Sequence, residues 1–346
     1  MRLKNLLGLL TRPTPKVGIT PADVVFRENK WSLLRYQARP EGRKFATPLL
    51  LVPSLINRHY VLDLMPGKSL IEYLVAQGHD VFCIDWGTPG DEDRFLSFDD
   101  IVDGYLGRAL RQTCEVANAS RAHVLGYCMG GTLAAIHAAR HPERFASFAA
   151  LAAPVHFADA GLLSGMSRSK TFDLDALLAA TGNVPWQLLQ SAFQLLRPTL
   201  PLSKAVMVID RAGSEEFLDG HLALEAWGSD NVAIPGEFYR TYLQQLYRDD
   251  ALVKGTFALG GQCVRLQQIG CPTLVVTFEH DNIVPTACAR PLLELISSRD
   301  KHHLHLPGGH VGAVVSKHAG KTLWPQLSAF WAERDVPALR VARRDG

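Results

Sequence analysis

The sequence predicts an α/β fold in which a mostly parallel sheet is flanked by helices. Short apolar runs bounded by turn residues alternate with longer segments of helical periodicity, which is the pattern of βα units. Apolar residues make up 47% of the 346 residues, enough to bury a substantial core. We therefore expect a large globular α/β protein rather than a disordered chain.

The apolar runs predict six strands, and the periodic segments between them predict helices. Strands are expected at residues 48–52, 80–84, 123–127, 145–152, 273–278 and 302–306. Helices are expected at residues 68–77, 101–117 and 131–140. Runs this short and this apolar are typical of strands that are buried on both faces of a parallel sheet.

One segment interrupts this alternation. Residues 153–254 carry Leu-rich helical patterns, prolines and glycines, but no clear strand. We interpret the segment as a helical cap inserted into the sheet domain. A second independent domain is the alternative, but the strand pattern at 273–278 indicates that the chain returns to the first core. The predicted organisation is a single domain over residues 1–346, with the cap inserted at 153–254.

Charge and cysteine content narrow the class of protein. The formal net charge is only +2, so the basic footprint of a dedicated nucleic-acid binder is missing. The cysteines form no CxxC pair and no zinc-type spacing, which favours free thiols in a reducing cytosol. The N-terminal apolar run covers only residues 6–10, shorter than the roughly 7 to 15 residues of a secretion signal. We expect a cytoplasmic protein.

The strongest local motif is Gly-Tyr-Cys-Met-Gly-Gly at residues 126–131. It lies directly after an apolar run and directly before an Ala-rich helix, as in the strand, turn and helix of a nucleophile elbow. Cys128 takes the place of the usual serine. Side chains at Gly126 and Gly130 would clash in so tight a turn, and the helix N-terminus favours a thiolate. The motif predicts an α/β-hydrolase fold with Cys128 as its nucleophile.

Two later residues complete a candidate triad. Asp281 follows the strand expected at 273–278, and His310 follows the strand expected at 302–306. On this fold the chain order is nucleophile, acid and histidine, and loops after parallel strands meet at one edge of the sheet. An Asp in a turn or a His among glycines is commonplace by itself. Their joint placement after the elbow predicts a Cys128–His310–Asp281 triad.

The oxyanion hole of this fold takes one backbone N–H from the residue after the nucleophile and one from the loop after an early strand. Those positions are Met129 and, in the loop at residues 53–57, Leu55. The cluster His302, His303 and His305 suggests a metal, but strand alternation sends His303 to the face opposite His302. We predict no metal site and no cofactor.

These motifs together resemble the polyhydroxyalkanoate synthases, and the length and layout resemble the catalytic subunit of the class III enzymes. The resemblance covers most of the chain and rests on residues 50–58 (LLVPSLINR), 60–64 (YVLDL), 84–87 (IDWG), 126–131 (GYCMGG), 235–237 (PGE), 281–285 (DNIVP) and 308–312 (GGHVG). Two positions depart from it. Asn282 stands where the family has His after the catalytic Asp, and His59 stands where class III chains often have Pro.

The resemblance implies an acyltransferase that polymerises (R)-3-hydroxyacyl-CoA into a polyester through a thioester on Cys128. CoA would then belong to substrate and product and would not be a cofactor. It also implies a growing polyester chain, a second non-catalytic synthase subunit and a place at the surface of cytoplasmic polyester granules. A homodimer remains open, as does the monomer preference.

Two kinds of alternative remain open. The nearest is a Cys-dependent thioesterase or an intracellular polyhydroxyalkanoate depolymerase on the same fold, which would use the same three residues. The other is a non-catalytic granule-associated protein that has kept the fold, in which Cys128 would be unreactive. The sequence also leaves open whether Asp281 orients His310 or helps to activate the hydroxyl.

Overall fold

The computed structural model describes residues 12–158, 161–169, 171–196 and 198–335. An eight-stranded sheet runs through its centre, in the order β1-β2-β4-β3-β5-β6-β9-β10. The six strands from β4 to β10 are parallel, and β1 and β2 extend the sheet as an antiparallel edge. The strands are β1 (Ala22–Glu28), β2 (Trp31–Tyr36), β3 (Leu49–Val52), β4 (Val81–Asp85), β5 (Ala122–Tyr127), β6 (Phe145–Leu151), β9 (Thr273–Phe278) and β10 (Lys301–Leu306).

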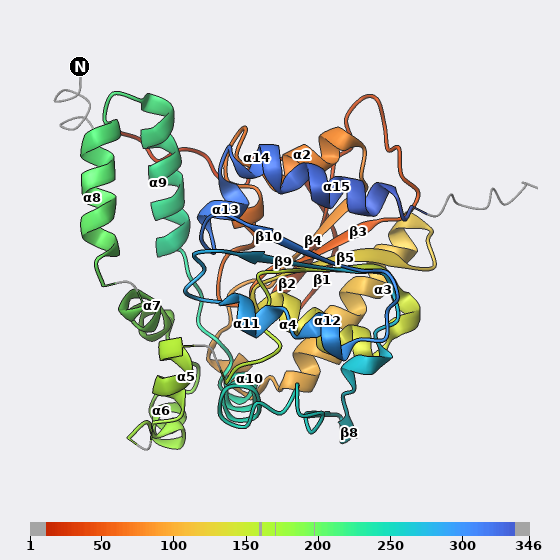
Figure 1. The fold of residues 1–346 in the computed structure, drawn as a ribbon, viewed down its shortest axis with the longest axis vertical. Helices are drawn as coiled ribbons and strands as arrows, with labels where there is room; N and C mark the ends of the chain where they lie inside the picture. The colour runs from red at the N-terminus through yellow and green to blue at the C-terminus, as the bar shows by residue number, and fades with distance from the viewer. Residues whose placement is uncertain (1–11, 159–160, 170, 197, 336–346) are drawn as a thin grey trace, which may run out of the picture.

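Helices cover both faces of the sheet (Figure 1). One layer holds α2 (Leu70–Gln77), α13 (Gly312–Val315), α14 (Ala319–Thr322) and α15 (Trp324–Ala332). The other holds α3 (Gly107–Ala117), α4 (Met129–Arg140), α11 (Thr286–Ala289) and α12 (Leu292–Leu295). Each layer buries its own cluster of apolar side chains against the sheet. Strands β3, β5 and β9 are therefore buried at every residue.

Local sequence explains where the helices begin and end. The Ser69 hydroxyl accepts a hydrogen bond from the Glu72 N–H at 2.8 Å and caps the start of α2. Gly78, at φ 95°, ends the same helix in the left-handed conformation that glycine adopts without a steric penalty. The expected helix at 101–117 is a π-helical segment, η3 (Asp100–Leu106), that continues directly into α3.

Between β6 and β7 (Ala258–Leu259) the chain leaves the sheet. The described residues there form a run of helices, which extends to the left of the sheet and below it in Figure 1. They are α5 (Gly161–Ser167), α6 (Leu174–Thr181), α7 (Trp186–Leu195), α8 (Leu200–Arg211), α9 (Glu215–Ser229), α10 (Gly236–Thr241) and the π-helical η5 (Tyr242–Arg248). Whether this run acts as a cap stays a prediction.

The short elements complete the fold. β7 pairs with β8 (Gln262–Cys263), and the remaining short helices are η1 (His59–Leu62), η2 (Asp91–Phe95), η4 (Pro142–Arg144) and η6 (Leu266–Gln268). None of the helices in the described part of the chain is both long enough and apolar enough to cross a membrane.

The predicted fold class is confirmed, and each of the six expected strands is present with its ends shifted by at most one residue. The expected strand at 145–152 stops at Leu151 because Ala152 turns to a φ of 46°. The antiparallel pair β1 and β2 was not predicted.

Candidate active site

Cys128 lies in the turn between β5 and α4, at the carboxyl end of the parallel strands. Its backbone has φ 55° and ψ −128°, a conformation that L-residues rarely adopt. The Cys128 N–H donates to the Leu151 carbonyl at 3.0 Å, which fixes the turn to the neighbouring strand β6. The thiol is partly exposed. This is the geometry of a nucleophile elbow, with the sulfur of Cys128 at the position of the nucleophile.

Three glycines allow this turn. A Cβ at Gly130 would lie 2.2 Å from the carbonyl oxygen of Val52, and one at Gly126 would lie 2.3 Å from the Cα of Gly131. A Cβ at Gly131 would in turn lie 2.3 Å from the Cβ of Ala153. The predicted need for glycine at 126 and 130 is confirmed, and residue 131 shares it. The helix and strand approach each other too closely for any side chain at these positions.

Asp281 and His310 meet at the same edge of the sheet, on the loops after β9 and β10. Nδ1 of His310 lies 2.7 Å from Oδ2 of Asp281. The other carboxylate oxygen of Asp281 accepts the N–H groups of Ile283, at 2.9 Å, and Val284, at 2.8 Å. The Asp281 side chain is fully buried. These contacts fix the carboxylate, and the carboxylate fixes the orientation of the imidazole.

Tyr127, the last residue of the strand before the elbow, also contacts His310. The Tyr127 ring stacks on the His310 ring, with centroids 5.3 Å apart, and its hydroxyl donates to the His310 carbonyl at 3.3 Å. Burial by itself lowers the pKa of His310. The Cys128 thiolate and the Asp281 carboxylate more than reverse this effect and raise that pKa to about 10. Negative charge on Cys128 and Asp281 therefore favours the protonated form of His310.

Cys128 lies between two cavities. The larger, about 440 Å³, is lined mainly by apolar side chains from α5, α7, α10 and η5. The smaller, about 180 Å³, contains His310 and polar groups such as Asn57 and Gln190. Leu189 and Phe193 of α7 line both cavities. The thiol thus faces one apolar chamber and one mixed chamber, with a helix of the inserted segment between them.

The structure brings the three predicted triad residues together and leaves the oxyanion hole as a prediction. Met129 is the first residue of α4 and lines the larger cavity. Ile56 lines both cavities around Cys128, whereas the Leu55 side chain faces a separate small cavity beside Trp86. The loop after β3 therefore lies beside Cys128.

Sequence reasoning missed several residues of the site. Tyr127 could have been found, because it directly precedes Cys128 in the elbow. Leu189 and Phe193 could not, because an apolar helical pattern does not tell which residue covers a distant nucleophile. The His cluster on β10 lies apart: His303 and His305 both contact the Thr277 hydroxyl, and His302 contacts Asp300. The prediction that His302 and His303 lie on opposite faces of the strand is confirmed.

Asn282 and His59 are the two residues that depart from the family pattern, and the structure shows where each lies. Asn282 is exposed in the turn after Asp281. His59 lies with its Nδ1 3.3 Å from Oδ1 of Asp85, at the end of β4. The Asp281–His310 contact is formed with Asn282 present.

Comparison with known proteins agrees with this fold. A family model described as the alpha/beta hydrolase fold matches residues 47–315. A second, described as the N-terminus of poly-beta-hydroxybutyrate polymerase (PhaC), matches residues 14–74. The crystal structure of a soluble variant of monoglyceride lipase from Saccharomyces cerevisiae superposes with a TM-score of 0.57 at 12% identity, over 94% of this chain and 100% of that one. This last similarity concerns the fold alone.

Curated relatives identify the family. The poly(3-hydroxyalkanoate) polymerase subunit PhaC of Allochromatium vinosum is 34% identical, and the match covers 96% of this chain and 94% of the relative. The protein of the same name from Haloferax mediterranei is also 34% identical, over 92% of this chain and 65% of the relative. The chain therefore belongs to the poly(3-hydroxyalkanoate) polymerase subunit PhaC family and has the α/β-hydrolase fold.

Proposed function

We propose that this protein is a poly(3-hydroxyalkanoate) polymerase that transfers 3-hydroxyacyl groups from CoA to a growing polyester through a covalent thioester on Cys128. The observation that carries the proposal is the position of Cys128 at the head of α4, between two cavities and beside the buried His310–Asp281 pair. The names of the relatives support the polyester product.

In the first step the thiolate of Cys128 attacks the carbonyl carbon of the acyl-CoA thioester. The new C–S bond forms on Cys128, the C–S bond to CoA breaks, and the imidazolium of His310 protonates the departing CoA thiolate. The Met129 N–H, with an N–H of the loop that carries Leu55, holds the developing oxyanion. Because one thioester replaces another, the acyl group stays activated.

In the second step a 3-hydroxyl group attacks the acylated Cys128. Neutral His310 accepts the hydroxyl proton, a new ester bond forms, and the Cys128 thiolate leaves. The buried carboxylate of Asp281 holds the imidazole in position and stabilises its protonated form. The thiolate and the imidazolium are thereby regenerated for the next monomer.

Polymer growth requires that a 3-hydroxyl group, and not water, attacks the acylated Cys128. The lining of the larger cavity supports this requirement, because the inserted helices contribute aliphatic and aromatic side chains around Cys128. We assign residues 153–254 the role of a cap that excludes water. An apolar chamber of this kind also suits the methylene and methyl groups of a polyester.

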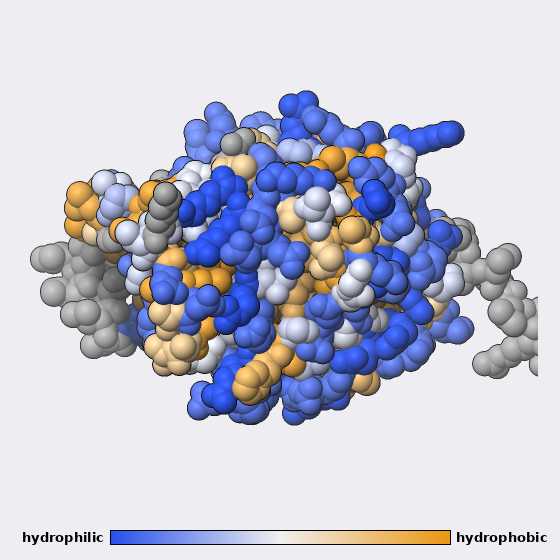
Figure 2. Space-filling model, turned by 90° about the horizontal axis from the view of Figure 1, so that it is seen from below, coloured by the Kyte–Doolittle hydropathy of each residue, from blue (hydrophilic) through white to orange (hydrophobic). Residues whose placement is uncertain are grey.

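The same helices bear apolar side chains on their outer surface. Orange side chains gather at the left of the face seen in Figure 2, the side on which α7 and α8 lie in Figure 1. Met166, Leu188 and Leu195 are exposed and also line the larger cavity. This surface suits a polyester granule in the cytoplasm. A second, non-catalytic synthase subunit and a homodimer are further parts of the proposal.

The test is CoA release together with product analysis from (R)-3-hydroxybutyryl-CoA. The intact chain is compared with Cys128→Ala, each with and without a class III partner subunit. Insoluble polyester and CoA release that both depend on Cys128 are the expected result. Free hydroxyacid as the sole acyl product would assign a thioesterase, and shortening of added polyester would assign a depolymerase.

One further outcome would contradict catalysis altogether. A granule-associated protein without activity would release no CoA with the partner present, and its Cys128 would react with iodoacetamide no faster than an exposed thiol such as Cys263. Cys263→Ser is the matched control variant, since it removes an exposed thiol outside the site and should leave activity unchanged.

A further inference from the structure

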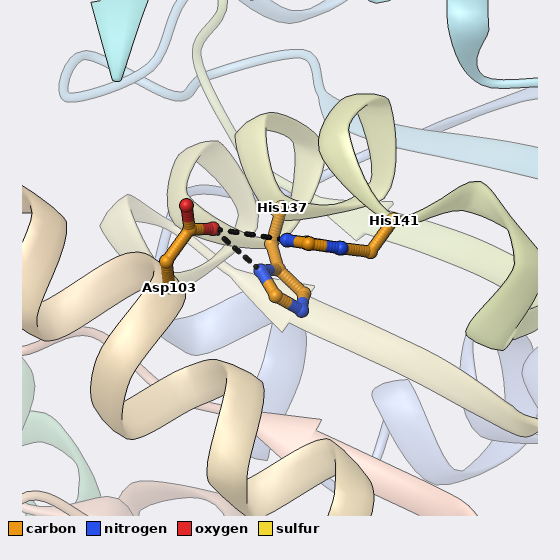
Figure 3. Close-up of side chains that lie close together, drawn as sticks. All are labelled: Asp103, His137 and His141. Atoms are coloured by element: carbon orange, nitrogen blue, oxygen red, sulfur yellow. Dashed lines mark hydrogen bonds and ion pairs between the residues drawn. The ribbon is translucent and has the colours of Figure 1, made fainter. Parts of the chain in front are cut away.

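A second group of reactive side chains lies at the opposite end of the nucleophile helix. Asp103 comes from η3, and His137 and His141 come from the last turn of α4 and the residue after it. Oδ1 of Asp103 is 3.3 Å from Nδ1 of His137 and 3.4 Å from Nε2 of His141. In Figure 3 the carboxylate reaches from one helix towards both rings. Three potential ligand atoms thus converge from two elements.

Two of the separations between these atoms match those of a metal site. The three atoms lie within 4.8 Å of one another. Zinc bonds of about 2.0–2.1 Å to nitrogen or oxygen, at tetrahedral angles, place neighbouring ligand atoms about 3.3 Å apart. Both Asp103 contacts have this separation, which is longer than the usual ~2.8 Å of a charge-assisted hydrogen bond. The residues at 137 and 141 are four apart, so the helix presents both rings on one side.

The partial exposure of the cluster and its position at a helix end also suit a cation. His137 is 2% exposed, which fixes its ring, while Asp103 and His141 are open enough for an ion to enter. The carboxyl end of a helix carries partial negative charge. Arg140 contacts the other oxygen of Asp103, at 3.4 Å, and leaves Oδ1 towards the two rings.

We propose that Asp103, His137 and His141 bind a divalent first-row transition metal such as Zn²⁺, with water completing a four-coordinate shell. The ion would join η3 to the end of α4. The twelve residues of α4 span about 18 Å at about 1.5 Å per residue, so the ion lies far from Cys128. Its role is therefore to stabilise the helix that carries the nucleophile.

The test is a calorimetric titration of the purified full chain with Zn²⁺, repeated with Co²⁺ by visible absorption. Both use a Cys128→Ala background, because a thiolate beside His310 could itself bind zinc. We expect one ion per chain, a four-coordinate Co²⁺ spectrum and a higher Tm in the presence of Zn²⁺. Asp103→Asn and His141→Gln should each weaken binding by about 10-fold or more.

His303→Gln is the matched control, because it removes one of two neighbouring histidines on β10 outside the proposed site. It should leave stoichiometry, affinity and the Tm shift unchanged. His141 is partly exposed, so its variant should fold, which circular dichroism without metal checks. The proposal is overturned if no ion binds, or if binding survives unchanged in both Asp103→Asn and His141→Gln.

Discussion

The phenolic oxygen of Tyr60 lies 2.7 Å from Oδ2 of Asp230, and this contact joins two segments that are 170 residues apart. Arg58 contacts the other oxygen of Asp230 at 3.1 Å, and Trp227 donates to the Arg58 carbonyl at 3.0 Å. Burial raises the pKa of Tyr60, so its hydroxyl remains a donor. The loop after β3, which carries Leu55, is thereby held against the end of α9.

Tyr60→Phe should therefore lower both the stability and the rate of catalysis. Loss of a hydrogen bond to a carboxylate costs about 1.5–3 kcal/mol, and freedom of the loop should lower kcat by about 10-fold. The measurement is kcat for CoA release together with the free energy of unfolding in urea. Tyr73→Phe, on α2 against Trp324, is the control. Equal kcat values for the two variants would contradict a positioning role for Tyr60.

Asp281→Asn should abolish most activity while keeping the local fold. The asparagine oxygen can still accept the Ile283 and Val284 N–H groups, but its amide would face Nδ1 of His310. The proton would then sit on Nε2, and the ring could not accept one from Cys128. We expect a loss on the order of 10³-fold in kcat/KM. Glu279→Gln, at an exposed position two residues earlier, should retain full activity.

Gly130→Ala should disrupt the elbow. The added methyl would lie 2.2 Å from the Val52 carbonyl oxygen, and backbone atoms cannot move aside without breaking the strand pairing. We expect a loss of about 3 kcal/mol or more in the free energy of unfolding, with no detectable CoA release. Gly165→Ala in α5 has open space around the new methyl and should be stabilising by about 0.5–1 kcal/mol. Similar stabilities for the two variants would contradict the packing argument.

Phe193→Ala should shift the reaction from polymer growth towards hydrolysis. Phe193 lines both cavities, so its removal would connect the apolar chamber with the mixed one and admit water to the acylated Cys128. The ratio of free hydroxyacid to polyester is the quantity to measure, and we expect it to rise by about 10-fold. Phe95→Ala, which removes an aromatic ring that is 68% exposed, should leave that ratio unchanged.

Stability should fall in mild acid because of two buried histidines. Burial lowers the pKa values of His79 and His123 to about 4, against about 6.5 in the unfolded chain. Between these values the unfolded chain binds protons that the folded protein excludes, so the free energy of unfolding falls as the pH drops from 6.5 to 4. Each histidine contributes a slope of about 1.4 kcal/mol per pH unit.

His79→Gln should remove one of these slopes, and it keeps a group that can contact Ser328. The check is urea unfolding at several pH values between 4 and 7. His318→Gln changes an exposed histidine and should leave the wild-type slope intact. If the free energy of unfolding depends on pH in the same way in wild type and in His79→Gln, burial of His79 is not the cause.

Apolar runs were sufficient to predict the centre of the sheet but not its edge. β5 and β9 are buried at every residue, so their sequences are largely apolar and easily recognised. β1 is half exposed and includes Asp23, Arg27 and Glu28, and its partner β2 follows a turn at Asn29 without glycine. An edge hairpin of this kind gives neither a long apolar run nor a strong turn signal.

The triad could be predicted because each member follows a recognisable strand. Parallel register then fixes where Cys128, Asp281 and His310 meet, so their order and their places after strands were sufficient to predict the triad. The surroundings could not be predicted in this way. Packing between segments more than fifty residues apart decides which of Leu55 and Ile56 faces Cys128. The same kind of packing places α7 between the two cavities.

The glycine contacts around the elbow have a consequence for how its chemistry can change. Gly126, Gly130 and Gly131 fix the turn through close approaches to backbone atoms and to one alanine methyl, while the Cys128 side chain points towards the cavities. Exchange of the sulfur for oxygen, as in Cys128→Ser, would therefore alter the leaving group without repacking the fold. The atom at the tip of residue 128 therefore decides how the acyl group is held: as a thioester that is passed onward, or as an ordinary ester.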